Sequence, residues 1–390
     1  MAEKLDVAVV GAGPFGLSVA AHLRGRRVRT FGAEMETWRT CMPQEMLMRS
    51  AWEETSLSAP EGAGSLDEWV REAEESRTEP IPHPMFLRYS EWFAERFVDD
   101  RDPSRIASVE SSESGYRLTT EAGAEVDAEH VVVAVGVMPF AYVPPRLAEQ
   151  LGESISLATG IEDAGRHSGQ RVLVVGGGQA GLETAGLAAQ AGGTVELVTR
   201  STVRWFADHE PHYPRGRVQA RLYRLAYPVV GYGPPPLNRL VMMPDVFAKL
   251  PERTRRSLTA RILRSGGSPW LRGFVERSVR VTEHNTVEHV EQQSGGLVVR
   301  LTDGSEREVD HILIACGYRF DLDRLSFLSA AVRGRIATRN GWPVIDRFFR
   351  SSDPTMFFVG YAAEHRFGPL SRFVLGAEFS ALRVRQAIER

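Results

Sequence analysis

The order of apolar and polar residues along the chain predicts two buried strands that each lead directly into a glycine-rich turn. Leu5–Leu23 and Arg171–Ala189 both begin with a continuous apolar run, as expected for a strand covered on both faces. In each segment three glycines spaced GxGxxG follow, and then a stretch rich in Ala and Leu that is typical of a helix. Further apolar runs come at Val28–Phe31 and Thr194–Thr199. The pattern therefore predicts two βαβ units whose glycine turns lie about 165 residues apart.

Two other apolar runs end in glycine, at His130–Gly136 and His311–Gly317. More polar stretches with turn residues precede them, at Tyr116–Ala124 and Leu297–Gly304. Alternating patterns with turns are typical of antiparallel strands, whereas a continuous apolar run is typical of a parallel sheet. We therefore expect a β-meander after each βαβ unit that returns the chain to the parallel sheet. Met356–Gly360 is expected to form a last strand.

These elements predict the fold class and the division into domains. We expect an α/β fold with two Rossmann-like dinucleotide-binding domains, each with a β-meander, one inserted into the other. Residues 1–160 and 318–390 would form the first domain, which ends in a helix over Ser371–Glu389. Residues 161–317 would form the second domain, with a helical insertion at about 205–275.

Each glycine in such a turn has a distinct physical role. The first allows a tight bend, the second lets a pyrophosphate approach the backbone, and the third lets the helix pack closely on the strand. The helix N-terminus then offers free N–H groups to the anion. A tight turn that binds no nucleotide would have the same spacing, but a flanking strand and helix favour dinucleotide binding. The glycines, in this order, are Gly11, Gly13 and Gly16 in the first turn and Gly176, Gly178 and Gly181 in the second.

The residues after each second strand indicate which nucleotide binds where. In the second unit Arg200 follows the strand and Arg204 lies close behind. An acid at this position would bind the ribose 2′-hydroxyl of NAD, whereas an arginine accommodates the 2′-phosphate of NADP. The sequence favours NADPH there, with solvated arginines as the alternative. The first turn is then expected to bind FAD. Its second strand ends at Phe31 without an acid, so Glu34 is the candidate for the adenosine ribose.

The segment that follows resembles the flavin-binding region of flavin-containing monooxygenases. The run FGAEMETWR places Glu36–Arg39 where those enzymes have their GGTW element, and MPQEMLMRS follows it. AVG, ACGY and FVG stand where that superfamily has its strand-end glycines. GGGQ at Gly176–Gln179 resembles the second nucleotide motif of these enzymes and of the N-hydroxylating lysine and ornithine monooxygenases. The resemblance covers nearly the whole chain outside 205–275 and implies a flavoprotein that uses FAD and NADPH.

The motifs and the resemblance together mark two sets of cofactor-binding residues. The FAD set is Gly11, Gly13, Pro14, Phe15, Gly16, Glu34, Thr37, Trp38, Arg39, Ser50, Gly136, Gly360, Pro369 and Leu370. The NADPH set is Gly176, Gly178, Gln179, Ala180, Gly181, Arg200 and Arg204.

Two departures from related families bear on the chemistry. Flavin-containing and Baeyer–Villiger monooxygenases carry the fingerprint FxGxxxHxxxW/F before the second nucleotide motif. The corresponding stretch here is SISLATGIEDAGRHSGQ, where Gly160 and His167 are seven residues apart and the initial Phe is absent. Many disulfide reductases of this fold have an Asp after the last-strand glycine, and Tyr361 follows Gly360 here.

Composition excludes several other chemistries. Lys4 and Lys249 are the two lysines, so 45 of the 47 basic residues are arginine, and Cys41 and Cys316 are the two cysteines. A CxxC redox pair, a cysteine zinc cage and a P-loop lysine are therefore excluded. His209–His212 has HxxH spacing but contains a proline and has no further ligand, so no metal is expected. A net charge of −3 gives no indication of nucleic-acid binding.

The expected function follows from what remains. The chain has no membrane-length apolar run and no signal peptide, so we expect a cytoplasmic protein. NADPH would reduce FAD, O2 would be the acceptor, and a C4a-hydroperoxyflavin would oxygenate a small soluble substrate by N-hydroxylation or another heteroatom oxidation. A helix near Pro369 would direct its positive end at the flavin. The alternatives are an NADPH oxidase or reductase that passes electrons to a quinone or protein partner, and a weakly active flavin-binding scaffold. No catalytic side chain or oligomeric state is predicted.

Overall fold

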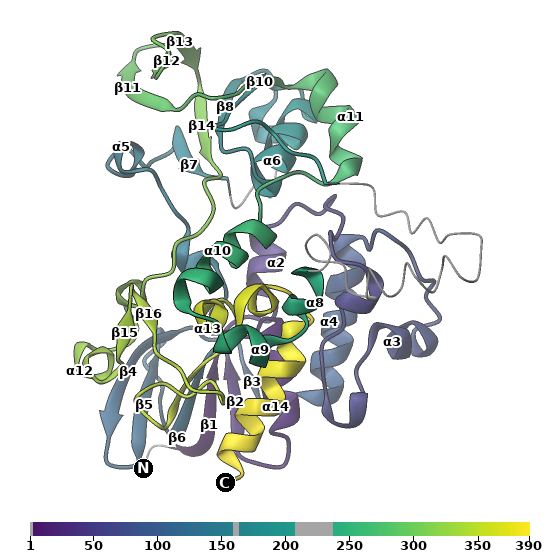
Figure 1. The fold of residues 1–390 in the computed structure, drawn as a ribbon, viewed down its shortest axis with the longest axis vertical. Coiled ribbons are helices and arrows are strands. Elements are labelled where there is room, and N and C mark those ends of the chain that lie inside the picture. Colours follow the sequence, from purple (N-terminus) through teal and green to yellow (C-terminus); the bar gives the residue numbers. More distant parts are fainter. Residues whose placement is uncertain (1–2, 159–163, 207–236) are drawn as a thin grey trace.

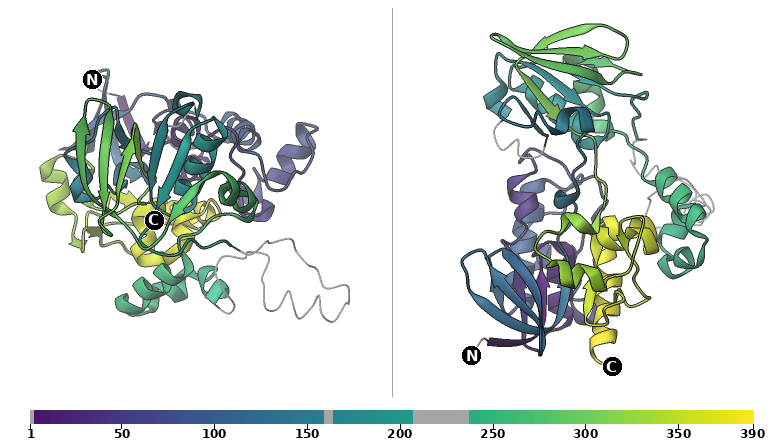
Figure 2. Two further views of the ribbon diagram at one scale, coloured as in Figure 1. Left: turned by 90° about the horizontal axis from the view of Figure 1, so that it is seen from above. Right: turned by 90° about the vertical axis from the view of Figure 1, so that its left-hand side faces the viewer.

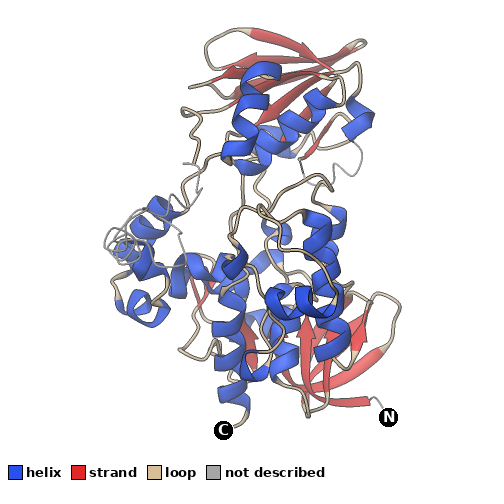
Figure 3. Cartoon of the chain, turned by 90° about the vertical axis from the view of Figure 1, so that its right-hand side faces the viewer, coloured by secondary structure: helices blue, strands red, loops and turns tan. Residues whose placement is uncertain are grey.

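A computed structural model of the chain describes residues 3–158, 164–206 and 237–390. The strands gather at opposite ends of the molecule, with helices between them (Figure 3). We call these two parts the first lobe, built on β1–β6 and β17, and the second lobe, built on β7–β14. The α/β fold with two Rossmann-like sheets, each with a meander, is confirmed.

The first lobe contains a seven-stranded sheet in the order β3-β2-β1-β6-β5-β4, with β17 also paired to β6. Strands β1, β2, β3, β6 and β17 are parallel, and β4 and β5 are antiparallel. The strand β6 forks: Ala128 pairs with β5, and Val131 pairs with β17. The strands are β1 (Glu3–Val10), β2 (Val28–Phe31), β3 (Arg101–Asp102), β4 (Ile106–Ser112), β5 (Gly115–Thr120), β6 (Glu125–Val133) and β17 (Met356–Phe358).

The second lobe contains a five-stranded parallel sheet in the order β10-β9-β8-β14-β7 and a separate antiparallel meander, β11-β12-β13. Its strands are β7 (Ile155–Leu157), β8 (Arg171–Val175), β9 (Thr194–Val198), β10 (Arg280–Thr282), β11 (Val287–Gln293), β12 (Gly296–Leu301), β13 (Glu306–Val309) and β14 (His311–Ile314). The strand β7 precedes residue 160 and yet pairs with β14. If each domain is defined by its sheet, the boundary lies before β7, whereas we expected it between residues 160 and 161.

Helices pack on both sheets and also lie between the two lobes (Figures 1 and 2). In the first lobe α1 packs against α14, and α4 packs on α1 and α3. In the second lobe α6 packs against α11. The bounds are α1 (Pro14–His22), α2 (Glu36–Thr40), α3 (Leu66–Glu72), α4 (His83–Phe97), α5 (Pro145–Ala148), α6 (Gln179–Gln190), α11 (Pro269–Ser278), α12 (Ala330–Arg335), α13 (Glu364–Phe367) and α14 (Gly376–Ile388).

The described part of the 205–275 insertion joins the first lobe, although it lies in the sequence between strands of the second. It contains α8 (Leu237–Val241), α9 (Pro244–Lys249) and α10 (Glu252–Ile262). These helices pack against α13 and the 3-10 turn Gly368–Arg372. A Cβ on Gly368 would lie 2.6 Å from the Phe247 ring, so the contact is close. In Figure 2 these helices lie at one side of the molecule, next to the C-terminal elements.

The C-terminal helix begins later than the sequence suggested. Residues Gly368–Arg372 form a 3-10 turn, Phe373 is extended with φ −105° and ψ 148°, and α14 starts at Gly376. The extended residue separates the turn from the helix, so the N-terminus of α14 does not lie at Pro369. The expectation of a helix from Ser371 with its positive end at Pro369 is therefore wrong.

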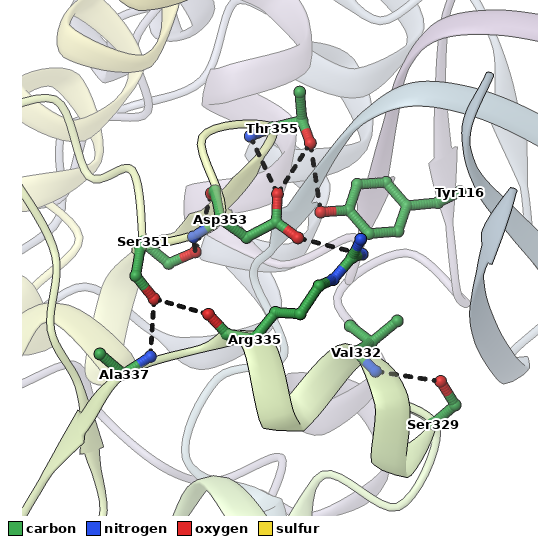
Figure 4. Close-up of polar contacts among 9 residues, drawn as sticks. Tyr116, Ser329, Val332, Arg335, Ala337, Ser351, Asp353 and Thr355 are labelled. Carbon is green, nitrogen blue, oxygen red and sulfur yellow. Dashed lines mark hydrogen bonds and ion pairs between the residues drawn. The ribbon is translucent and has the colours of Figure 1, made fainter. Parts of the chain in front are cut away.

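A buried polar network links the loop before β17 to the strand β5 and the helix α12 (Figure 4). The Asp353 carboxylate is 7% exposed, and its Oδ2 lies 3.0 Å from Nη2 of Arg335. The Thr355 hydroxyl lies 3.0 Å from Asp353 Oδ1 and 3.2 Å from the Tyr116 hydroxyl. Because buried polar groups need such partners, the network holds the position of β17 beside β6.

Candidate cofactor and substrate site

The first glycine turn joins β1 to α1 at the carboxyl edge of the first sheet. Gly11 has φ +114°, and a Cβ there would lie 2.4 Å from the Ala134 carbonyl oxygen, so a side chain is excluded. A Cβ on Gly16 would lie 1.8 Å from the Gly11 oxygen. A Cβ on Gly13 would meet nothing within 4 Å. Open space at the second glycine, at the N-terminus of α1, fits an approaching pyrophosphate.

The other strand-end glycines of the FAD set lie at the same edge. Gly136 follows β6 with φ +69° and open space around it. Gly360 follows β17 with φ +66°, and a Cβ there would touch the Phe15 ring at 3.3 Å. The resemblance thus selected glycines that the fold gathers beside the first turn. Pro369 and Leu370 lie in the buried 3-10 turn next to α14.

Glu34 follows β2 and has a partly unsatisfied carboxylate. Its Oε2 accepts from Arg101 at 2.9 Å, and its buried Oε1 lies 4.0 Å from Nη2 of Arg39 without a hydrogen bond. Burial raises the pKa of Glu34, and the charges of Arg101 and Arg39 oppose that rise. A buried carboxylate oxygen without a donor fits the ribose hydroxyl that the sequence assigned to it.

The predicted flavin segment separates into two parts. Thr37 lines a large cavity between the lobes. Trp38 packs on α4, with its ring centroid 4.8 Å from that of Phe86. Arg39 donates to the Glu34 carbonyl at 3.0 Å and to Glu91 at 2.6 Å. Trp38 and Arg39 therefore brace the helix α2 that carries Thr37. Ser50 is half-buried in the loop that follows.

The second glycine turn reproduces the backbone of the first. Gly176 has φ +128°, with a Cβ position 2.3 Å from the Ala315 oxygen, and a Cβ on Gly181 would lie 1.9 Å from the Gly176 oxygen. The space at Gly178 is again open, with Ser265 at 3.9 Å. The Oε1 of Gln179 accepts from the backbone N–H of Ser268 at 2.7 Å and so ties α6 to α11. Ala180 lies beside it on the cavity wall.

The cavity between the lobes has a volume of about 1490 Å³. Its walls come from the second glycine turn and the strand ends of the second lobe, and from the segment Thr37–Met46, the loop Met138–Tyr142 and the helix α10. Arg200 and Arg204, predicted to bind the 2′-phosphate, line it and are exposed. Eight arginines line it: Arg146, Arg200, Arg204, Arg255, Arg256, Arg264, Arg319 and Arg372. This basic wall suits an anionic ligand such as a dinucleotide.

Two carboxylates on the described walls, Glu183 and Glu364, were not selected from the sequence. Burial raises the pKa of each to about 7, and nearby Arg49 and Arg372 oppose the rise. The Oε2 of Glu364 lies 3.4 Å from Nε of Arg372 without hydrogen-bond geometry. Groups that titrate near neutrality in a cavity are candidates for proton transfer. The sequence offered no signal for them, because burial depends on the tertiary packing.

Both cysteines line this same cavity, although 275 positions separate them in the sequence. Cys41 lies at the end of α2, and Cys316 follows β14. Burial raises the pKa of Cys316, which keeps its thiol protonated at neutral pH. Sequence spacing excluded a CxxC pair but gave no information about this juxtaposition.

Two neighbouring residues of α13 differ in their relation to the cavity. His365 lines it, and Arg366 is absent from its lining. His209, His212 and Gly160 lie outside the described residues. In the described ranges no group of three His, Cys, Asp or Glu side chains could hold a metal ion. No helix in those ranges is both long and apolar enough to cross a bilayer.

Comparison with known proteins gives a consistent assignment. The pattern described as Pyridine nucleotide-disulphide oxidoreductase matches residues 5–209 and 253–374. The chain is 26% identical over 352 residues to indole-3-pyruvate monooxygenase YUCCA1 of Oryza sativa subsp. japonica, covering 85% of this chain and 80% of that protein.

Two solved structures show the breadth of this fold. The ornithine N-hydroxylase KtzI of Kutzneria sp. 744 aligns with a TM-score of 0.79 at 16% identity, covering 99% of both chains. The bacillithiol disulfide reductase Bdr of Bacillus cereus aligns with a TM-score of 0.67 at 14% identity, again covering 99% of both. At these identities the likeness shows the fold and leaves the activity open.

Proposed function

The chain belongs to the pyridine nucleotide-disulphide oxidoreductase family, and on that premise we propose that it is an FAD- and NADPH-dependent monooxygenase. The proposed reaction is the oxygenation of a nitrogen or another heteroatom of a small molecule by O2. The observation that carries the proposal is the cavity, in which the second glycine turn shares one space with Thr37 and the segment Cys41–Met46 of the first lobe. The similarity to an indole-3-pyruvate monooxygenase and the fold shared with an ornithine N-hydroxylase support it.

The residues present fit both cofactors. Open space at Gly13 and the unsatisfied Glu34 oxygen fit FAD, and open space at Gly178 beside Arg200 and Arg204 fits NADPH. When bound, reduced FAD supplies the activation of oxygen. In this proposal the first lobe holds FAD and the second lobe, built on β7–β14, holds NADPH.

The chain's own groups orient the cofactors and manage protons. Arg200 and Arg204 bind phosphate, which positions the nicotinamide end in the cavity. The carboxyl of Glu364, with a pKa of about 7, holds or releases one proton beside Arg372. Apolar walls from Met42, Met46 and Met138 limit water in the part that adjoins Thr37. We place the enzyme in the cytoplasm, because two unbridged cysteines suit a reducing compartment.

Rapid mixing under anaerobic conditions tests this function. We expect NADPH to bleach the FAD-loaded protein, and subsequent O2 to give a transient spectrum distinct from both the oxidised and the reduced flavin. Peroxide release should be slow relative to NADPH-dependent reduction. Immediate reoxidation with one peroxide released per NADPH would contradict a monooxygenase and would indicate an oxidase.

A thiol or disulfide reductase is the second candidate, because Cys41 and Cys316 line the same cavity. The fold shared with a bacillithiol disulfide reductase makes this worth a separate test. NADPH-dependent reduction of a low-molecular-weight disulfide that is lost in both Cys41→Ser and Cys316→Ser would favour it. Retention of NADPH oxidation with O2 in both variants would favour the monooxygenase. Transfer of electrons to a quinone would be detected by the same assay with a soluble quinone as acceptor.

A further inference from the structure

We propose that the part of the cavity lined by Arg255 and Arg256 binds an organic carboxylate, held by these two arginines beside the ring of Trp342. This inference rests on the proposed function, since it names the class of substrate that the site would accept. Its residues come from α10, from α13 and from the strand β16 (Trp342–Pro343), and these elements lie near one another in Figure 1.

The helix α10 runs between two different parts of the cavity. Beyond its C-terminal end, Ser265 lies against the open space at Gly178. Near its other end, Nε of Arg255 donates to the His365 carbonyl at 3.1 Å. The helix from Arg255 to Ile262 spans about 10 Å at a rise of 1.5 Å per residue. The end of α10 that adjoins the second turn therefore lies about 10 Å along the helix from Arg255.

The guanidinium of Arg255 is fixed in place by carbonyl groups. Its Nη1 donates to the Ala248 oxygen at 3.2 Å and to the Leu250 oxygen at 2.8 Å. Among the residues that the structure describes, no carboxylate lies within ion-pair distance of it. The nearby Glu252 instead contacts Arg339 at 3.3 Å and accepts from Asn340 at 2.9 Å. A half-buried guanidinium with free Nη2 donors is suited to a bidentate carboxylate.

The surface next to these arginines is flat and aromatic. The ring of Trp342 stacks on that of His365, with centroids 5.9 Å apart and planes at 22°. Both residues line the cavity. Burial lowers the pKa of His365, so its ring is neutral at pH 7 and adds no charge to the arginines. The Trp342 ring also stacks on that of Phe320, with centroids 4.6 Å apart and planes at 18°. An aromatic body attached to the carboxylate would contact the part of Trp342 that lines the cavity.

The charges of the walls disfavour a cation. Glu183 and Glu364 are the carboxylates on the described walls, and each has a pKa of about 7, so neither carries a full charge at neutral pH. At the nucleotide end Arg200 and Arg204 would be matched by phosphates of the proposed cofactor. Arg256, an exposed side chain of α10, has no carboxylate within ion-pair distance in the described part of the chain. An amine without an acid group would be repelled from this end.

Calorimetric titration of the FAD-loaded protein tests the proposal with pairs of probes of opposite charge. Benzoate and phenylacetate are the acids, and benzylamine and phenethylamine are the matched amines. We expect the acids to bind and the amines to bind far more weakly or not at all. Arg256→Gln and Arg255→Met should each weaken acid binding about tenfold or more.

Controls separate this effect from misfolding and from the proposed reaction. Arg253→Gln changes an exposed arginine of α10 that does not line the cavity, and should leave acid affinity unchanged. Arg255→Lys keeps the charge if Arg255→Met fails to fold. Equal binding of amines, no acid binding at millimolar concentration, or unchanged affinity in the Arg255 and Arg256 variants would overturn the proposal. Because binding is measured without turnover, loss of the monooxygenase assignment would leave this result standing.

Discussion

The two glycine turns have nearly the same backbone and very different surroundings. At the first glycine of each, a Cβ would lie 2.4 Å or 2.3 Å from the carbonyl oxygen of a neighbouring strand end. The first turn, however, is followed by Glu34, which Arg101 holds, whereas the second is followed by Arg200 on an open cavity wall. In the proposed function, the backbone geometry provides a pyrophosphate site common to both turns, and the charges at the end of each second strand select the nucleotide.

The largest effect is expected where the two turns are most alike. Gly16→Ala places a methyl group 1.8 Å from a carbonyl oxygen and should cost about 3 kcal/mol of unfolding free energy, with loss of FAD. Gly181→Ala should produce a yellow protein that NADPH no longer reduces. Thermal unfolding and the flavin absorbance measure both outcomes. Gly13→Ala, in open space, is the control for folding. Loss of FAD in the Gly181 variant would show that the lobes are not independent.

The next effect concerns the charge that distinguishes the second turn. Arg200→Ala should raise the KM for NADPH by about tenfold to a hundredfold, because charge-assisted bonds to a phosphate contribute about 1.5–3 kcal/mol. The KM for NADH should change little. Arg204→Ala should have the same sign. Steady-state reduction with both nucleotides measures this, and equal changes for NADPH and NADH would refute the role of Arg200.

The carboxyls Glu364 of the first lobe and Glu183 of the second permit a comparison by pH. Each has a pKa raised from 4.5 to about 7 by burial, so folding favours the protonated form. The contribution of each carboxyl to the free energy of unfolding is complete below its pKa in the unfolded chain and is lost as the pH rises through about 7. Glu364→Gln and Glu183→Gln should each flatten the decline in unfolding free energy over that window by about 2 kcal/mol. Denaturant titrations between pH 5 and pH 8 measure this free energy. If a carboxyl is ionised in the folded protein, its Gln variant would leave the dependence of the unfolding free energy on pH unchanged.

The smallest effect is expected at the charge that distinguishes the first turn. Glu34→Gln keeps the shape and the Oε1 acceptor but removes the charge opposite Arg101. FAD affinity should fall by about threefold to tenfold, since a hydrogen bond to a charged acceptor is stronger than one to a neutral acceptor. Flavin fluorescence during dilution measures this. An unchanged affinity for FAD would remove Glu34 from the site.

Local sequence patterns predicted the strands and glycine turns, whereas the position of α10 and the properties of the cavity residues depend on tertiary packing. Apolar runs and glycine spacing predicted β1, β2, β8 and β9 to within a residue or two, because a buried parallel strand and its turn have strong local signals. The position of α10 against α13 depends on contacts such as that of Phe247 with Gly368, which no local pattern specifies. The raised pKa of Glu364 and the shared cavity of the two cysteines likewise arise only in the folded chain.

The fork in β6 has a consequence for the order in which the protein forms during synthesis. All strands of the five-stranded sheet in the second lobe lie within residues 155–314. This sheet can therefore form as soon as these residues have left the ribosome. The first lobe begins earlier but needs β17 beside Val131 and α14 against α1, which are made last. We therefore expect the inserted lobe to mature first and the flavin lobe to close around an already folded neighbour. A chain stopped before β17 would keep a nucleotide site and lack the completed flavin site.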